Sequence, residues 1–394
     1  MSTAPPLGAA NPGVPKLGVY IHWPYCARIC PYCDFNVFRH RPDRRGGDEP
    51  AALARAIVAD LVAQRALTGP RDLVSIFLGG GTPSLMDPDW AGEMIAACRR
   101  LWTAAPDLEV TLEANPTDAE AGRFAAFADA GVGRLSLGVQ ALDDAALVLL
   151  GRNHDAAAAI RATLAARRAF PRLSIDLIYA RPGQTPVAWR QELTRALDLG
   201  AEHVSPYQLT IEAGTAFDRA VRRGVLVPPD AETGAALFDT TQAVLEAAGF
   251  DAYEVSNHAR GEAARSRHNL VYWQGQDYLG VGPGAHGRIT RNGAREATCA
   301  AARPADYLAR VADAGTGLAT RETLSAREAA QERLLSGLRI TEGVAMAEVA
   351  ALAIPADRIA GLVDLGLLAD DPHRLRATPA GRLVLDRLTV ELAS

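Results

Sequence analysis

Three cysteines, Cys26, Cys30 and Cys33, lie within eight positions in the segment HWPYCARICPYCDFN (residues 22–36). Their spacing is C-x3-C-x2-C, and the other two cysteines of the chain are isolated in the sequence. Zinc sites commonly use two C-x2-C pairs or cysteines with histidines, and electron-transfer cubane clusters need four thiolates. Three thiolates would hold three irons of a four-iron cluster and leave the fourth iron open to a ligand. The alternatives are a partial zinc site or three ordinary loop cysteines.

The segments around this cysteine motif alternate between strand-like apolar runs and helical periodicity. Helical patterns include residues 49–67, a helix from about 88 to 101, and one over 117–131. Strand-like runs occur at residues 17–23, 73–84, 108–116, 134–140, 173–183 and 203–209. Six strands that alternate with helices predict an α/β fold, a partial parallel (β/α)6 barrel of the TIM type.

Polar residues and glycines stand where several of these strands are expected to end. The second strand runs into GGGT (residues 79–82), and Glu113, Gln140 and Asp176 lie at or near the ends of later strands. Because the carboxyl ends of barrel strands meet on one face, we expect these residues to gather beside the cysteine loop. A buried, unpaired carboxylate is costly, so Asp176 in an apolar strand should face a site or a partner.

These motifs together resemble the radical S-adenosylmethionine (SAM) superfamily. Within it, the chain from Leu17 onward is similar to the oxygen-independent coproporphyrinogen III oxidase-like family. The resemblance rests on YIHWPYCARICPYCDFN, FLGGGTPS, EANP, SLGVQ, GRNH, DLIYARPGQT and YQLTIEAGT. It implies a [4Fe–4S] cluster on Cys26, Cys30 and Cys33 whose open iron binds SAM. In that superfamily one electron from the cluster cleaves SAM to methionine and a deoxyadenosyl radical.

The resemblance also implies which residues contact SAM. These residues are Tyr20, Tyr32, Gly80, Gly81, Thr82, Glu113, Gln140, Arg152 and Asp176. The tyrosines would flank the cofactor near the cluster, and the glycine turn would let the backbone approach its methionine moiety. The four polar side chains would bind its amine, carboxylate and ribose groups. If the resemblance is set aside, the sequence is also compatible with Arg152 in a solvated connection between helices.

Three features separate two branches of this family, the coproporphyrinogen III dehydrogenases and the haem chaperones. The dehydrogenases carry a further cysteine where this chain has Phe35, and a longer extension than the 16 residues that precede Leu17. HNLVYW (residues 268–273) matches the HNxxYW motif typical of the chaperones. We therefore expect a protein that binds haem and transfers it to an acceptor. The alternative is an enzyme that catalyses oxidative decarboxylation of coproporphyrinogen III. A third interpretation, a scaffold without chemistry, is disfavoured by the intact cofactor motifs.

His268 is the expected haem ligand, because imidazole is a standard axial ligand of haem iron. Tyr272 and Trp273 would line an apolar slot for the porphyrin. The alternative is that His268 is a structural hydrogen-bonding residue beside the cluster pocket, with His286 and His258 as lesser candidates for the ligand.

Four regions are expected along the chain. They are a disordered lead-in (1–16), a radical SAM partial barrel (17–215), a barrel-completing region with the HNxxYW motif (216–300), and a small, mostly helical, winged-helix-like domain (301–394).

Composition narrows the range of partners. A net charge of −5 and the lack of a basic patch argue against a nucleic-acid partner. The chain shows neither a membrane-spanning run nor a secretory signal, and its five cysteines form no disulfide framework, so we expect a cytoplasmic location. The resemblance adds haem, a haem-acceptor protein such as a respiratory one, and an electron donor for the cluster. Peripheral membrane association and formation of a homodimer are further alternatives that the sequence does not decide.

Overall fold

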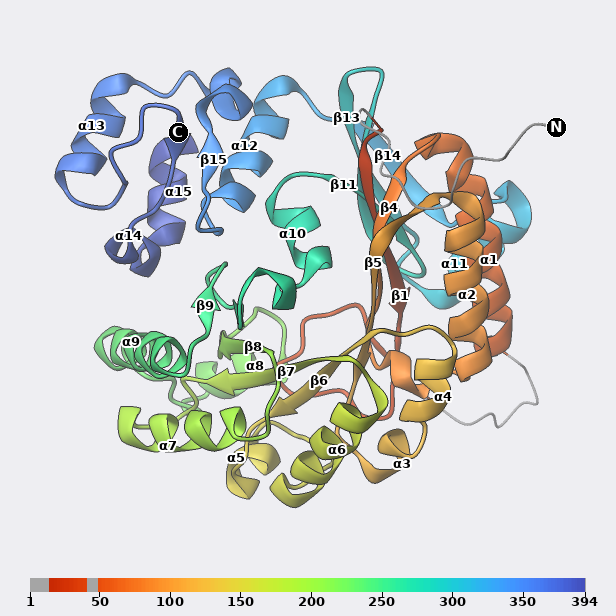
Figure 1. Cartoon of the computed structure of the whole chain (residues 1–394), viewed down its shortest axis with the longest axis horizontal. Helices are drawn as coiled ribbons and strands as arrows, with labels where there is room; N and C mark the ends of the chain where they lie inside the picture. The colour runs from red at the N-terminus through yellow and green to blue at the C-terminus, as the bar shows by residue number, and fades with distance from the viewer. Residues whose placement is uncertain (1–13, 41–48, 394) are drawn as a thin grey trace.

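The fold is built on a curved twelve-stranded sheet with helices along its outer side (Figure 1). The computed structural model describes residues 14–40 and 49–393. Most of the expected lead-in therefore lies outside the described residues. The centre of the sheet consists, in spatial order, of the parallel strands β11 (Asp277–Val281), β1 (Lys16–Trp23), β4 (Asp72–Gly80), β5 (Thr103–Ala114), β6 (Arg134–Gln140), β7 (Arg172–Tyr179) and β8 (His203–Gln208).

Antiparallel strands extend both edges of this parallel centre. Beyond β11 lie β12 (His286–Arg291), β13 (Ala294–Ala300) and β14 (Leu318–Thr323), and beyond β8 lie β10 (His258–Ala259) and β9 (Asp251–Ala252). The sheet ends at two different strands, so the barrel stays open. The predicted partial parallel barrel is confirmed, and β11 adds a seventh parallel strand that the sequence did not reveal.

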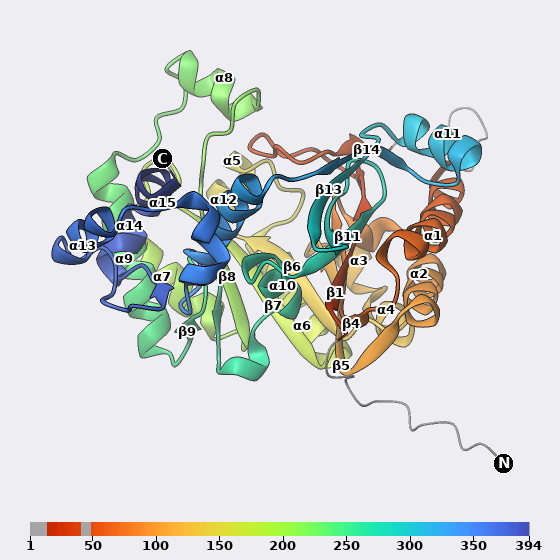
Figure 2. The same ribbon diagram turned by 90° about the horizontal axis from the view of Figure 1, so that it is seen from above.

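Helices connect the strands and cover the outer face of the sheet. They are α1 (Glu49–Thr68), α2 (Pro88–Leu101), α5 (Asp144–Leu149), α6 (Ala156–Ala169), α7 (Pro186–Leu197), α9 (Ala231–Ala247) and α11 (Pro304–Ala314). The short helix α8 (Ala216–Arg222) follows β8 and does not cover this face (Figure 2). Figure 2 shows α8 projecting from the body of the molecule. Among the described helices, none combines the length and apolar character needed to cross a bilayer.

The alternation of side chains along β1 explains why polar groups gather inside the barrel. Leu17, Val19 and Ile21 are fully buried in the main core, whereas Tyr20 faces the interior, where its ring stacks on His268. Since successive residues of a strand point to opposite faces, His22 shares the inner side with Tyr20. The apolar side chains on the outer face of β1 thus pack in the core and stabilise the fold, and the inner face is available for polar groups.

The expected helix over residues 117–131 is interrupted. It forms two short helices, α3 (Asp118–Ala121) and α4 (Phe124–Asp129), with Arg123 at the start of the second. Arg123 Nη1 donates to the carbonyl oxygen of Ser84 at 2.8 Å. This long-range contact anchors Arg123 to the segment before α2, and helical periodicity in the sequence does not reveal it.

The predicted domain boundary at residue 301 lies too early. Tyr307 of α11 is fully buried in the main core, and its hydroxyl donates to Asp60 Oδ2 at 2.7 Å. Strand β14 pairs with β13 and so belongs to the same sheet. A separate apolar core begins only with Ala330. The helical domain therefore starts after β14.

This C-terminal domain packs several helices around its own leucine-rich core. Its elements are α12 (Ala326–Gly337), β15 (Val344–Ala345), η3 (Met346–Leu352), α13 (Ala356–Asp364), β16 (Arg374–Leu375), α14 (Pro379–Leu383) and α15 (Leu385–Ala393). A short helix inside the sheet domain, α10 (Arg267–Trp273), contacts β1, β4 and β11 on one side and α12 on the other. It links the barrel interior to the C-terminal domain.

Candidate metal and cofactor site

A cavity of about 950 Å³ lies at the carboxyl ends of the parallel strands, between the cysteine loop and the C-terminal domain. Most of the predicted site residues line it. They are Cys26, Cys30, Tyr32, Cys33, Gly80, Gly81, Thr82, Glu113, Gln140, Arg152 and Asp176. Tyr20 and His268 are not among the lining residues.

The cysteine loop is held against the glycine turn that follows β4. Gly81 N donates to Trp23 O at 2.7 Å, and Thr82 N donates to Tyr25 O at 2.9 Å. A Cβ at position 81 would lie 2.7 Å from the Tyr25 oxygen, so only glycine permits this approach. The Thr82 hydroxyl lies 3.6 Å from Cys26 Sγ. The two motifs that the sequence analysis paired are thus in direct contact.

The far end of the cysteine loop is fixed by Asn36. Its carbonyl oxygen lies 2.9 Å from His22 Nε2, and the other ring nitrogen of His22 lies 2.9 Å from the Tyr20 hydroxyl. Asn36 Nδ2 donates to the carbonyls of Pro283 and Ala302 at 2.9 and 2.8 Å. Tyr20 therefore supports the loop through its hydrogen bond to His22. It is not one of the residues that line the cavity.

The donor set of the loop fits an iron–sulfur cluster better than a single metal ion. All three cysteines are free thiols at the same cavity. The described residues contain no group of three or more His, Cys, Asp or Glu side chains placed to hold one metal ion. A cubane cluster does not need ligands that converge on one metal ion, because each thiolate binds a different iron. The remaining cysteines are Cys98, buried in α2, and Cys299, in β13.

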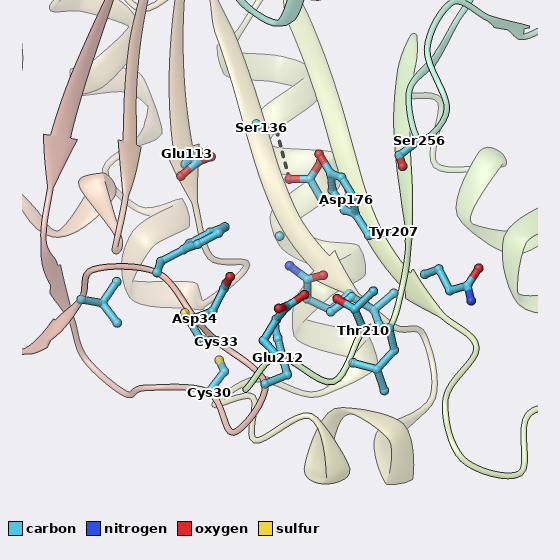
Figure 3. A pocket seen from close by; sticks show the side chains of 18 of the residues that line it. Cys30, Cys33, Asp34, Glu113, Ser136, Asp176, Tyr207, Thr210, Glu212 and Ser256 are labelled. Carbon is cyan, nitrogen blue, oxygen red and sulfur yellow. Dashed lines mark hydrogen bonds between the residues drawn. The ribbon is translucent and has the colours of Figure 1, made fainter. Parts of the chain in front are cut away.

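Glu113 on β5 and Asp176 on β7 present carboxyl groups to the cavity, and Ser136 lies between them on β6 (Figure 3). Gly80 N donates to Glu113 Oε2 at 3.0 Å, and Ser136 Oγ donates to Asp176 Oδ2 at 3.1 Å. Burial, followed by the charge of Asp176, raises the pKa of Glu113 to about 8. Burial raises the pKa of Asp176 to about 6. A ligand with ammonium or hydroxyl donors would stabilise the ionised forms.

Arg152 joins the cysteine loop to the ends of β5 and β6. Its Nη1 lies 3.4 Å from Cys30 Sγ and 3.5 Å from the Tyr32 hydroxyl. Its Nη2 donates to Gly138 O at 3.1 Å and to Asn115 Oδ1. Its Nε is buried and has no hydrogen-bond partner among the described residues. The guanidinium therefore places a positive charge and a free donor beside the thiols.

Two of the four left-handed non-glycine residues in the described part of the chain lie at this edge of the sheet. Gln140, at the end of β6, has a φ of 65°, and Ala180, just after β7, has a φ of 58°. Such left-handed conformations are unfavourable for residues with a Cβ and cluster at functional sites. Gln140 lies in an irregularity of the pairing between β6 and β7, and it lines the cavity.

His268, the expected haem ligand, lies on α10 and does not line the cavity. It is buried on α10, with Nδ1 2.9 Å from Ser75 Oγ and Nε2 2.7 Å from the Tyr272 hydroxyl. Its ring stacks on Phe77 at 4.8 Å. Ser75 precedes Gly80 by five positions on β4, about 16 Å along the strand. The geometry supports the structural alternative, because both ring nitrogens are occupied and the ring lies away from the cavity.

Several cavity residues were not found from the sequence. Ser136 and Gly138 share a strand face with Gln140, so the two-residue period of β6 could have revealed them. The other missed residues include Asn115, Tyr207, Thr210, Glu212 and Ser256 and, from the C-terminal domain, Arg339, Arg382, Leu383, Val384, Asp386 and Arg387. Figure 3 shows Thr210 and Glu212 on the same side of the view as Cys30 and Cys33.

Comparisons with known proteins agree with this geometry. Residues 20–195 match the Radical SAM superfamily. The mitochondrial radical S-adenosyl methionine domain-containing protein 1 of Bos taurus is 42% identical, over 97% of this chain and 88% of its own length. The chain belongs to the radical SAM superfamily. Residues 324–384 match the HemN C-terminal domain, which places the start of that domain directly after β14.

Other relatives of this radical SAM protein carry the name heme chaperone HemW. The one from Mycobacterium tuberculosis is 37% identical, over 96% of this chain and 95% of its own. The one from Bacillus subtilis is 35% identical, over 82% and 84%. The structure of coproporphyrinogen III oxidase (HemN) from Escherichia coli superposes with a TM-score of 0.79, covering 97% of this chain and 91% of that one. Its identity of 21% shows a shared fold alone.

Replacing His268 in this radical SAM protein should change its stability and not its haem spectrum. His268→Ala leaves the hydroxyls of Ser75 and Tyr272 without their partner and opens a cavity beside Phe77. We expect a loss of about 3 kcal/mol, measured by urea unfolding. The Soret band of bound haem should keep its position. A shifted or missing Soret band in a folded variant would restore His268 as the ligand.

The raised pKa of Glu113 predicts a pH-dependent stability of the cofactor-free radical SAM protein. The carboxyl of folded Glu113 keeps its proton up to a pH of about 8, whereas an unfolded chain releases it near 4.5. Between these values the folded state binds more protons, so stability falls as the pH rises. Glu113→Gln should remove a fall on the order of a few kcal/mol between pH 5 and pH 8, measured by urea unfolding.

Glu246→Gln, at an exposed position of α9, is the matched control and should leave the pH profile of the wild type unchanged. An identical pH profile for Glu113→Gln and the wild type would contradict the burial of an ionisable carboxyl at this site.

Proposed function

We propose that this radical SAM protein is a haem chaperone that binds haem and transfers it to an acceptor protein, while it carries a [4Fe–4S] cluster and exchangeable SAM. The observation that carries the proposal is the similarity, over nearly the whole chain, to proteins named heme chaperone HemW. Phe35 agrees with it, because this exposed side chain stands at the cavity where the dehydrogenase branch has a fourth cysteine.

The cluster in this proposal is held by Cys26, Cys30 and Cys33. When bound, it supplies an iron with an open position for SAM and an electron that can cleave SAM. Arg152 would stabilise the thiolate of Cys30, since its Nη1 lies 3.4 Å from the sulfur. The same guanidinium suits the carboxylate of SAM.

The remaining SAM groups would meet the strand ends. Glu113 and Asp176 would accept hydrogen bonds from the amine and the ribose hydroxyls, which favours their ionised forms. Gln140 adds an amide, and Gly80 and Gly81 keep Cβ atoms away from the methionine side. Tyr32 packs on Phe217 at 6.2 Å between ring centres, which fixes it at the edge of the cavity.

The proposal includes partners that the chain itself does not identify. They are a haem-acceptor protein, of which a respiratory haem protein is one class, and an electron donor for the cluster. For a bacterial protein, the proposal includes a cytoplasmic location. The relatives named heme chaperone HemW come from bacteria, whereas other relatives carry mitochondrial names. Peripheral membrane association and homodimer formation are tested by vesicle flotation and by sedimentation with and without haem.

An anaerobic titration of haem into cluster-reconstituted protein tests the function. We expect saturable binding with a defined Soret band, and transfer of that haem to an added apo-haem protein. Incubation with SAM, a reductant and coproporphyrinogen III should yield no protoporphyrinogen IX. Absent or non-saturable haem binding would overturn the proposal, and formation of protoporphyrinogen IX would establish the dehydrogenase alternative in its place.

A further inference from the structure

The C-terminal domain contributes one side of the cavity, and its chemistry differs from that of the strand ends. We call this side the C-terminal wall: Arg339 after α12, and Arg382, Leu383, Val384 and Arg387 of α14 and α15. It combines three guanidinium groups with two large aliphatic side chains. Asp386 is the acidic side chain that lies among them. Such a surface suits a ligand that is both apolar and anionic.

Arg382 has an unused hydrogen-bond donor. Its Nη2 is buried and has no partner among the described residues. Burial lowers the pKa of its guanidinium from the ordinary value. A buried charge without a partner is costly, so a ligand that brings an anion to Arg382 would recover the lost interaction.

Glu254, the acid whose charge acts most strongly on Arg382, already has other hydrogen-bond partners. Glu254 is fully buried and accepts from Arg339 Nε at 2.7 Å. Its other oxygen accepts from Ser256 N at 2.9 Å and Asn257 Nδ2 at 2.7 Å. This carboxylate thus forms hydrogen bonds with groups other than Arg382, on which Glu254 and Glu342 act only as nearby charges. The net charge available to a ligand at this wall is positive.

Large apolar side chains surround the same cavity although water can reach them. Ile29, Phe35, Tyr207, Leu383 and Val384 all line it and are between 43% and 62% exposed. Ile29 and Phe35 come from the cysteine loop, Tyr207 from β8, and the other two from the C-terminal wall. Apolar groups that converge on one cavity from three parts of the chain mark a binding site for an apolar ligand.

We propose that haem binds between the cysteine loop and the C-terminal wall, with Arg382 pairing with a propionate and Leu383 and Val384 packing on the macrocycle. This inference rests on the proposed function and specifies its binding site. A porphyrin has a flat apolar body and two carboxylates on one edge, which matches an apolar rim beside unpaired guanidinium groups. A guanidinium binds a carboxylate through charge-assisted hydrogen bonds that an ammonium or an amide reproduces only in part.

The test compares haem with haem dimethyl ester, in which both propionates are neutral. Dissociation constants are measured by Soret absorbance for cluster-reconstituted wild type, Arg382→Gln, Arg382→Lys, Val384→Ser and Arg310→Gln. Arg310 is an exposed residue of α11 outside the cavity and is the matched control. Arg382→Gln should weaken haem binding about tenfold or more, with Arg382→Lys between it and the wild type. A comparison of Arg382→Gln with Arg310→Gln separates the effect of Arg382 from the effect of losing one positive charge.

The ester gives the deciding comparison. Wild type and Arg382→Gln should bind it equally, whereas Val384→Ser should weaken the binding of both haem and ester. Equal binding of haem by wild type and Arg382→Gln would overturn the inference while the proposed function stands. An equal loss with haem and ester would also overturn it, because Arg382 would then act through the fold and not through a propionate. No haem binding by the wild type would remove the proposed function itself.

Discussion

Cys30→Ala is expected to abolish the broad visible absorbance of anaerobically reconstituted protein and to reduce bound iron from about four per chain to near zero. The cluster has three protein ligands in the proposal, so the loss of one leaves two irons without a thiolate. Arg152 Nη1, 3.4 Å from Cys30 Sγ, would then face an alanine in place of a thiolate. SAM binding that depends on the open iron should disappear with the cluster.

Cys299→Ala is the matched control for this experiment. Cys299 is a free, partly exposed thiol on β13, outside the cavity, with its sulfur 3.7 Å from His286 Nε2. Its removal should leave absorbance, iron content and SAM binding at wild-type levels. A cluster that survives in Cys30→Ala with unchanged absorbance would contradict the assignment of three cluster cysteines and would reopen the reading of Cys30 as an ordinary loop cysteine.

The barrel could be predicted because its signals are local. The segment 134–140 follows a glycine and has apolar residues at every second position, and β6 has those bounds. Asp87 and Pro88 mark a helix start, and α2 begins at Pro88 after Asp87 caps it. The carboxyl-end rule for parallel strands then brings Glu113 and Asp176 to the cavity that also holds the cysteines. Each step needs only neighbouring residues and one general rule of topology.

Sequence patterns do not settle the role of a residue where long-range contacts decide the structure. HNLVYW was interpreted as a haem slot because histidine and aromatic residues are compatible with one. In the structure the motif forms α10, which places His268 against Ser75 and Trp273 under the guanidinium of Arg339 at 4.6 Å. Nothing within the motif distinguishes these two uses. The C-terminal wall was missed for the same reason, since Arg382 lies far along the chain from the cysteines whose cavity it lines.

Arg152→Ala is expected to weaken SAM binding by about a hundredfold or more. The guanidinium holds the Cys30 sulfur, the Tyr32 hydroxyl and the Gly138 carbonyl in one arrangement, and its positive charge suits the SAM carboxylate. Its removal leaves the buried carbonyl of Gly138 without this donor, so stability should also fall by about 2 kcal/mol. Arg152→Lys keeps the charge but loses the planar fork, and should bind SAM with intermediate affinity.

Equilibrium dialysis with SAM, iron analysis and urea unfolding separate the two effects of this substitution. Arg190→Ala, at an exposed position of α7, controls for the loss of a positive charge and should match the wild type in all three measurements. If Arg152→Ala lowered stability but left the affinity for SAM unchanged, Arg152 would be only a structural link between the cysteine loop and β6. The carboxylate of SAM would then have to be bound by another cation of the cavity, and Arg28 is the arginine that the cysteine loop contributes to the lining.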